Sequence, residues 1–477
     1  MNLIHSFKWS MATEIVSKAI QPLVFIILAR ILTPEDFGVV SAALMVIAFS
    51  QIFWEAGMSK ALIQRQTELE DAANVAFWVN VGFGMVISGL LLFTARLIGD
   101  TFFHDDRVYS VIQVMTLQVL LGSVSSVHVA LLRKEMKFKK LFWIRFATVS
   151  IPGFASIPMA LNGMGYWALV SGTLIGQVAQ IILLWRMSHW RPKLKFPIFI
   201  AREMGRFGAW VGFSGLLAWF FVWADSLVVG MYLGSRELGL YRTGNQFAMM
   251  VFATLFSPIS PVLYSHLSQM NKNKERIGNA IETIIKVIIS IAIPIGMIIY
   301  SLSEPISIVL FGEKWLGVGL VIGVMALMHG FSWVVGMNGD VYRAMGKPAY
   351  EAIVTAGTLF IYLAAYIYSI KQGFEIFVWT RLLLALGALV LHLFVLRKVI
   401  QRPIMPIINY LVLITSVTGI VVMFIQWTIT KYFVYPWAKI AVGGPINLIV
   451  IGLIIYVMER DRMLKDLIPL FKKKRNA

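Results

Sequence analysis

Cysteine is absent from this 477-residue chain, and charged residues are scarce, at 14%. Without a thiol, the chain has no disulfide framework and no thiol chemistry. A soluble domain carries roughly a quarter charged residues, so this chain does not have the composition of one. What it has instead is 58% hydrophobic residues and a mean hydropathy of +0.78. The composition therefore indicates an integral membrane protein.

The sequence also lacks the signatures of catalysis. It has no nucleophile beside a base, no phosphate-binding loop of the Walker type and no paired aspartate motif for a metal-bound nucleotide sugar. His128, His329 and His392 are too scattered to suggest a metal site. We expect no catalytic residue, no metal and no cofactor, which excludes an ATP-driven pump and leaves a secondary transporter or a channel.

Apolar runs of roughly 20 residues recur along the chain, which is the length a helix needs to cross the hydrocarbon core of a membrane. Strands of a barrel would appear instead as short alternating segments. We therefore expect an all-α polytopic bundle of about fourteen transmembrane helices. The expected spans lie near residues 9–32, 37–57, 73–95, 108–131, 141–161, 166–187, 209–232, 240–263, 280–301, 317–338, 350–370, 375–396, 407–430 and 440–457.

Lysine and arginine predict the orientation, because cytoplasmic loops collect them. With the N-terminus inside, the inner loops carry most of the loop cations: Arg133, Lys134, Lys137, Lys139, Lys140, Arg186, Arg191, Lys193, Lys195, Arg202, Arg206, Lys272, Lys274 and Arg276. Both termini are then cytoplasmic, and the net charge of +18 reflects topology. Nucleic acid is a poor partner, since these cations are spread over short loops beside an anionic leaflet.

An internal repeat organises the chain. Residues 28–40 and 229–241 superpose without a gap, and later matches continue at a second fixed offset. The matched pairs include Leu32 with Leu233, Asp36 with Glu237, Gly38 with Gly239, Arg133 with Arg343, Lys137 with Lys347 and Gly163 with Gly373. Six spans per half give both halves the same orientation, so a parallel repeat is implied. The alternative is coincidence among apolar sequences.

The repeat and the polar segment 188–208 predict the domain boundaries. We expect an N-lobe at 1–190, a cytoplasmic linker at 191–208, a C-lobe at 209–398, two extra helices at 399–457 and a basic cytoplasmic tail at 458–477. The tail should lie on the inner membrane surface, held by anionic lipids. Docking of a glycosyltransferase or polymerase is the alternative.

Polar residues inside the first span are the leading functional candidates. A charged residue at a helix centre costs roughly 2.5–3.5 kcal/mol on insertion scales, so it tends to face a bundle interior or a wet cavity. Glu14, Lys18 and Gln21 share one helical face. Pro22 follows and could kink the helix so that this face moves with a gate. The alternative is a mutually neutralised pair that joins two helices.

Asp225 lies deeper, in the seventh span, and its cationic partner is not evident locally. It could carry a proton or an ion, or pair with Lys18 or Arg242 across the bundle. The cations nearer span ends are expected to reach the headgroups instead: Arg30, Arg145, Lys286 and Arg381. Trp54, Trp219 and Trp223 could stack on sugar rings, although interfacial belts explain most membrane tryptophans.

Six motifs carry a resemblance to a known family. They are LARILTPEDFGVV at 28–40, EAGMSKALIQR at 55–65, AFWVN at 76–80, LLRKEMKFKKL at 131–141, GMGYWALV at 163–170 and VVGMYLGSRELGLY at 228–241. In their order and spacing the chain resembles the polysaccharide-export branch of the MOP superfamily (multidrug, oligosaccharidyl-lipid and polysaccharide exporters). It is most similar to the Wzx-type flippases of the WzxC and teichuronic acid exporter group. The resemblance covers nearly the whole chain and weakens after about residue 400.

The resemblance implies two pseudo-symmetric six-helix lobes, as in MATE and MurJ proteins, with two extra C-terminal helices. It implies alternating access around a cationic cavity in a bacterial cytoplasmic membrane, driven by a proton or sodium gradient. The substrate would be an undecaprenyl-pyrophosphate-linked oligosaccharide, moved by a chain that acts as a monomer. We therefore expect these site residues: Lys18, Arg30 and Arg242 as cavity cations, Glu14 and Asp225 as cavity or coupling acids, and Pro22, Pro34, Gly38 and Gly239 at gates and turns.

Two alternatives stay open. A drug or cation antiporter of the same superfamily needs an acidic cavity, and here Glu14 and Asp225 are accompanied by Lys18. A membrane polymerase of the same pathway usually needs a sizeable outer loop, and the outer loops near 96–107 and 302–316 are short.

Overall fold

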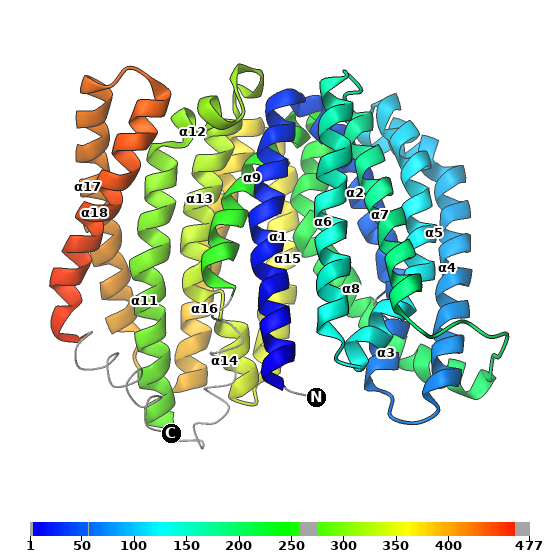
Figure 1. The fold of residues 1–477 in the computed structure, drawn as a ribbon. Coiled ribbons are helices and arrows are strands. Elements are labelled where there is room, and N and C mark those ends of the chain that lie inside the picture. Colours follow the sequence, from blue (N-terminus) through cyan, green and yellow to red (C-terminus); the bar gives the residue numbers. More distant parts are fainter. Residues whose placement is uncertain (1–2, 56, 258, 260–273, 463–477) are drawn as a thin grey trace. The chain divides into compact units, whose positions relative to one another are not determined.

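The computed structural model describes residues 3–55, 57–257, 259 and 274–462. Every regular element in these ranges is a helix, as Figure 1 shows. Twelve of the helices in the described part of the chain are long and apolar enough to cross a membrane. The predicted fold class, an all-α polytopic membrane protein, is therefore confirmed.

The chain divides into two compact units, residues 1–243 with 366–374, and residues 244–365 with 375–477. The helices that begin in the first unit are α1 (Leu3–Ile31), α2 (Pro34–Glu55), α3 (Met58–Gln64), α4 (Leu69–Ile98), η1 (Gly99–Phe103), α5 (Asp106–Lys134), α6 (Phe138–Leu161), α7 (Tyr166–Met187), α8 (Ile198–Leu233) and α9 (Ser235–Phe256). Those that lie mainly in the second unit are α11 (Lys274–Ser301), α12 (Ser303–Leu310), η2 (Glu313–Trp315), α13 (Val318–Val335), α14 (Asn338–Ala344), α15 (Pro348–Ile370), α16 (Phe374–Ile400), α17 (Met405–Tyr432) and α18 (Pro436–Arg462).

Each expected span coincides with a long helix, with two qualifications. The first span falls on α1, where the described apolar stretch is the shorter Ile20–Ile31. The eighth falls on α9, which is not among the twelve apolar helices and whose described part carries Arg236, Glu237 and Arg242 in its first half. The length and apolarity of the sequence runs thus predicted where the helices lie, and α9 differs from most of them in the charged residues of its first half.

The linker expected at 191–208 is helical from Ile198 onward, because α8 continues well beyond its apolar part. The compact units also group α8 with the preceding helices. These units reflect proximity in space, whereas the expected lobes were drawn from the sequence repeat, so the lobe boundaries stay a prediction. The end of the basic tail, from residue 463, lies outside the described residues.

Element boundaries follow the repeat. Helices α2 and α9 begin and end at residues that the repeat pairs. The turn after α5 also matches its counterpart after α14. Met136 and Gly346 both have a positive φ, of 55° and 68°, and in both turns the next N–H closes a bond to a carbonyl five residues earlier, Lys137 to Leu132 and Lys347 to Tyr342. The two halves of the sequence therefore build the same local structures.

In the first unit, α6 packs against α1 and α7, while α2 and α4 pack against α5. A glycine permits the close approach of α4 to α5, since a Cβ at Gly84 would lie 2.7 Å from the Cβ of Ser123. Membrane helices associate largely through such van der Waals contact. Helix α2 also packs against α8, which brings the two turns of the repeat within one unit.

In the second unit, α11 packs against α13 and α17, and α17 against α18. Lys286 of α11 was expected to reach the headgroups, and that prediction is wrong. Its side chain is 7% exposed and forms an ion pair with Glu282 one turn away. The lysine stays inside because this carboxylate neutralises it. Ser290 and Tyr410 join α11 to α17 through hydroxyls 2.6 Å apart.

Candidate functional site

A buried polar cluster joins α8 to the first turns of α9. Asp225 is 2% exposed, and its Oδ1 accepts hydrogen bonds from the backbone N–H of Ser226 at 2.5 Å and from its hydroxyl at 3.0 Å. The hydroxyl of Tyr241, fully buried on α9, donates to Asp225 Oδ2 at 2.7 Å. Three donors thus stabilise a carboxylate that would be costly to bury alone.

Arg242 lies beside this cluster, one residue after Tyr241. Its guanidinium carbon is 4.1 Å from the ring centroid of Trp223, which is close for a cation–π contact. One of its nitrogens donates to the Ser226 hydroxyl at 3.4 Å. Helix α8 therefore supplies both an aromatic face and a hydroxyl to hold the Arg242 side chain.

Asp225 and Arg242 attract each other without direct contact. The two charges interact, so one of the two partners predicted for Asp225 is near it. Within the described ranges, however, no carboxylate oxygen lies within 4.0 Å of the Arg242 guanidinium. Arg242 is partly exposed, and its guanidinium N–H groups can donate to an incoming anion.

The predicted residues of α1 are spread along the helix. Lys18 is half-buried and Arg30 is exposed. At 1.5 Å per residue, the two lie about 18 Å apart along the axis. The side chain of Glu14 lies outside the described residues. Helix α1 continues through Pro22 to Ile31.

The turn from α1 to α2 is built by local capping. The hydroxyl of Thr33 accepts from the Asp36 N–H at 3.3 Å, and the Thr33 N–H donates back to Asp36 Oδ2 at 3.0 Å. This reciprocal arrangement, with Pro34 at the first helical position, is a strong helix start. Asp36 Oδ1 also accepts from the N–H of Tyr166 at 2.9 Å, which ties α7 to the same turn.

This turn meets its own repeat. A Cβ at Gly38 would lie 1.7 Å from the carbonyl oxygen of Ser235, and a Cβ at Gly239 would lie 1.8 Å from that of Pro34. The repeat pairs Gly38 with Gly239 and Pro34 with Ser235. The two contacts, Gly38 with Ser235 and Gly239 with Pro34, are therefore equivalent under the repeat. We call this contact the glycine crossing. It needs glycine at both positions, because any side chain would overlap backbone.

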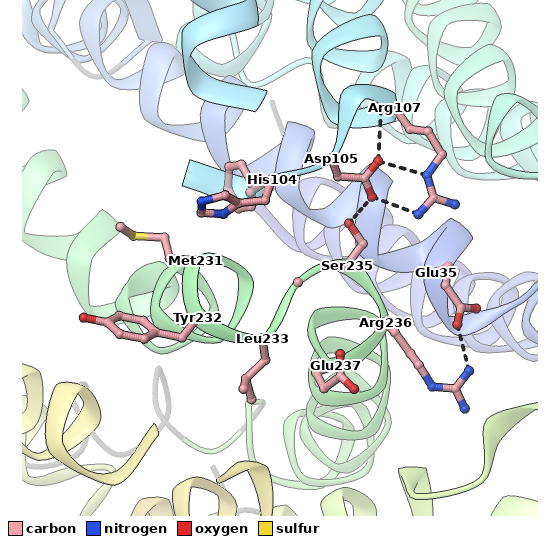
Figure 2. Close-up of a pocket in the computed structure, with 12 residues that line it drawn as sticks. Glu35, His104, Asp105, Arg107, Met231, Tyr232, Leu233, Ser235, Arg236 and Glu237 are labelled. Carbon is pink, nitrogen blue, oxygen red and sulfur yellow. Dashed lines mark hydrogen bonds and ion pairs between the residues drawn. The ribbon is translucent and has the colours of Figure 1, made fainter. Parts of the chain in front are cut away.

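Charged residues brace the glycine crossing, as Figure 2 shows. Arg236 forms an ion pair with Glu35 at 2.7 Å, and the Ser235 hydroxyl donates to Asp105 at 2.6 Å. Arg107 holds the same carboxylate at 2.8 Å. Burial raises the pKa of Asp105, but the hydrogen bonds from Arg107 and Ser235 outweigh this and lower it below its usual 3.8. These residues border a polar cavity of about 450 Å³.

The other predicted residues described here, two tryptophans and two histidines, contact neighbouring protein groups. Trp219 donates to the carbonyl of Met45 at 3.2 Å, and the ring of Trp223 is taken by Arg242. His329 contacts Asn245, and His392 contacts Tyr342. No group of three or more potential metal ligands occurs among the described residues.

The sequence missed several of these residues. Nothing in the spacing identified Tyr241, Ser226 or Trp223 as neighbours of the Asp225 and Arg242 pair. The repeat did contain a signal for the Glu35 and Arg236 pair, because the two residues occupy matching positions with opposite charge.

Comparison with known proteins gives one family. A family model described as "Polysaccharide biosynthesis protein" matches residues 27–319. Similar relatives are the succinoglycan biosynthesis transport protein ExoT of Rhizobium meliloti, 27% identical over 68% of this chain and 65% of its own length, and the lipopolysaccharide biosynthesis protein WzxC of Escherichia coli, 24% identical over 72% and 68%. The teichuronic acid biosynthesis protein TuaB of Bacillus subtilis is 21% identical over 77% and 76%. The match to ExoT thus spans slightly less than two thirds of that protein.

Solved structures share the fold. The lipid II flippase MurJ in an inward closed conformation has a TM-score of 0.78 at 15% identity, over 96% of this chain and 100% of its own. An inward-facing MATE family multidrug transporter has a TM-score of 0.59 at 13% identity, over 82% and 98%. At such identities the likeness shows the fold alone. The predicted resemblance to polysaccharide exporters is confirmed at the level of the family, because the matching family model covers more than half of the chain.

Proposed function

We propose that this chain, which belongs to the polysaccharide biosynthesis protein family, is a flippase for lipid-linked oligosaccharide. It moves an undecaprenyl-pyrophosphate-linked repeat unit from the inner to the outer leaflet by alternating access. The polymer is an exopolysaccharide, a lipopolysaccharide or teichuronic acid, the classes for which ExoT, WzxC and TuaB are named. The multi-pass helical fold supports a transport role for the chain.

The observation that carries the proposal is that the Arg242 guanidinium forms no direct ion pair with a described carboxylate. A guanidinium within a membrane protein is retained at a cost, and here no described carboxylate pairs with it directly. A pyrophosphate offers the charge and the bidentate oxygens that a guanidinium binds best. We assign Arg242 to the pyrophosphate. Since Lys18 and Arg30 are far apart along α1, they would meet the headgroup in turn as it crosses.

The remaining predicted roles belong to the same proposal. Glu14 and Asp225 are cavity acids that link transport to a proton or sodium gradient. Pro22 allows α1 to bend, and the glycine crossing, with Pro34, Gly38 and Gly239, closes one end of the cavity. A network of buried polar groups supports a functional role for Asp225, because its two carboxylate oxygens accept hydrogen bonds from Ser226 and Tyr241.

Location follows from the distribution of charge. We place the chain in the bacterial cytoplasmic membrane with both termini inside and the glycine crossing toward the outside. It acts as a monomer in contact with membrane lipids. A polymerase or a glycosyltransferase is a candidate partner for the basic tail.

A strain that lacks its own flippase gene tests the function. Expression of this chain should restore surface polysaccharide and reduce accumulated lipid-linked repeat units. Arg242→Ala, present in the membrane at normal levels, should abolish this rescue. Arg186→Ala removes an exposed cation from the end of α7 and is the matched control. Unchanged accumulation across strains with different repeat units would contradict the proposal. Uptake of a fluorescent cation into vesicles would then favour the antiporter.

A further inference from the structure

The hydroxyl of Ser226 lies between two opposite charges. It donates to Asp225 Oδ1 at 3.0 Å and accepts from Arg242 at 3.4 Å. Asp225 and Ser226 are adjacent on α8, while Tyr241 and Arg242 are adjacent on α9. The two helices thus face each other with two consecutive residues each, and the acid and the cation are diagonal to one another.

Such an arrangement requires an explanation, because a carboxylate and a guanidinium normally close into a bidentate ion pair. Their attraction is stronger away from water. Asp225 is kept from closing by the hydrogen bonds that hold both of its oxygens, Oδ1 by Ser226 and Oδ2 by Tyr241. Trp223 holds the guanidinium from its other side through the ring face.

We propose that Tyr241 and Ser226 are positioning residues that hold Asp225 away from Arg242, so that the guanidinium stays open to the pyrophosphate of the substrate. Asp225 then balances the charge of Arg242 from a distance and does not occupy its N–H groups. This inference rests on the proposed function, since it concerns the anion that Arg242 binds. The Tyr241 hydroxyl thus affects substrate binding through Asp225 and does not itself touch the substrate.

A double substitution distinguishes the positioning of Asp225 by Tyr241 from a purely structural role of Tyr241. In Tyr241→Phe the hydroxyl is lost and Asp225 can close onto Arg242, so anion binding should weaken about tenfold, the scale on which a close charge pair alters affinity. In Tyr241→Phe with Asp225→Asn there is no carboxylate to close, and affinity should return to within about threefold of the wild type. Asp225→Asn alone should bind the anion as tightly as the wild type, or more tightly.

Farnesyl pyrophosphate is the probe, titrated against the purified full-length protein in lipid nanodiscs. Farnesyl monophosphate and farnesol report the contribution of the second phosphate and of the chain. Trp223→Phe keeps a ring under the guanidinium and should weaken binding about threefold. Trp219→Phe, one helical turn earlier on α8, is the matched control and should bind as the wild type does. The melting temperature of each variant establishes that it is folded.

Wild-type affinity in Tyr241→Phe would overturn the inference, and so would failure of Asp225→Asn to restore binding to a folded double variant. The Arg242→Ala variant tests the proposed function on which the inference rests. If Arg242→Ala binds the probe normally, Arg242 is not the pyrophosphate site. If Arg242→Ala loses binding while Tyr241→Phe keeps it, the proposed function survives and only the positioning role fails. In cells, Tyr241→Phe should slow export at low substrate supply and approach wild-type rates at high supply.

Discussion

The glycine crossing predicts the effect of a single methyl group. In Gly38→Ala the new Cβ would lie 1.7 Å from the Ser235 carbonyl oxygen and 2.6 Å from its carbonyl carbon. Both are backbone atoms, so no side-chain rotation relieves the overlap. Ordinary contact requires the two helix starts to separate by about 1.8 Å, since carbon and oxygen atoms rest near 3.5 Å.

The cost of such overpacking is typically 1–3 kcal/mol, and a rigid backbone obstacle puts it at about 3 kcal/mol. That cost falls only on the state in which the turns touch. A population ratio changes tenfold for each 1.4 kcal/mol, so the closed state should lose roughly a hundredfold in population relative to open states. Gly239→Ala, with its Cβ 1.8 Å from the Pro34 carbonyl oxygen, should behave alike.

Because the chain has no cysteine, this population can be measured directly. Glu35→Cys with Arg236→Cys places two thiols where an ion pair of 2.7 Å now forms. A short bifunctional thiol reagent should link them rapidly, and Gly38→Ala should slow the reaction by up to about a hundredfold. Gly89→Ala is the matched control, because its Cβ would meet nothing within 4 Å. Equal linking rates in Gly38→Ala and the parent would refute the tight crossing.

Three further perturbations have defined outcomes. Glu35→Arg sets two guanidiniums against each other and should lower export, whereas Glu35→Arg with Arg236→Glu should recover it; no recovery would show that the charges do not meet. Since the pKa of Asp105 is lowered, its contribution to stability is present at neutral pH and is lost as pH falls below about 4. The melting temperature of Asp105→Asn should therefore be less sensitive to acid than that of the parent, and parallel pH profiles would contradict this. Glu282→Gln leaves Lys286 buried without its carboxylate and should cost about 3 kcal/mol of stability, less when combined with Lys286→Met; thermal unfolding in detergent compares the two.

The sequence predicted the helices well because a membrane imposes length and apolarity on them. Hydropathy failed where a helix leaves the apolar layer. Helix α8 begins at Ile198, before the expected start at 209, and its first turns carry Arg202, Glu203 and Arg206. Charged residues stop an apolar run without stopping backbone hydrogen bonding. The start of α8 therefore cannot be found from hydropathy alone.

The candidate site was predictable only in part. The cost of a buried charge identified Asp225 and Arg242 as residues that need partners. It could not identify Tyr241, because a hydroxyl one helix away is specified by side-chain direction and not by spacing. Nor could it place Lys286, whose partner Glu282 lies one turn earlier in the same helix.

The glycine crossing also shows why a duplicated sequence must diverge at certain positions. Where two copies of a segment meet about a local two-fold, each residue on the axis faces its own counterpart. Identical charges there would repel, and here the matching residues are Glu35 and Arg236, which attract at 2.7 Å. Identical residues are tolerated only if they are small, and here both are glycine, each against the backbone of the other helix start. Within this one contact the two copies differ at Glu35 and Arg236 and agree at Gly38 and Gly239. The charge pair provides a bond that separation of the two turns must break.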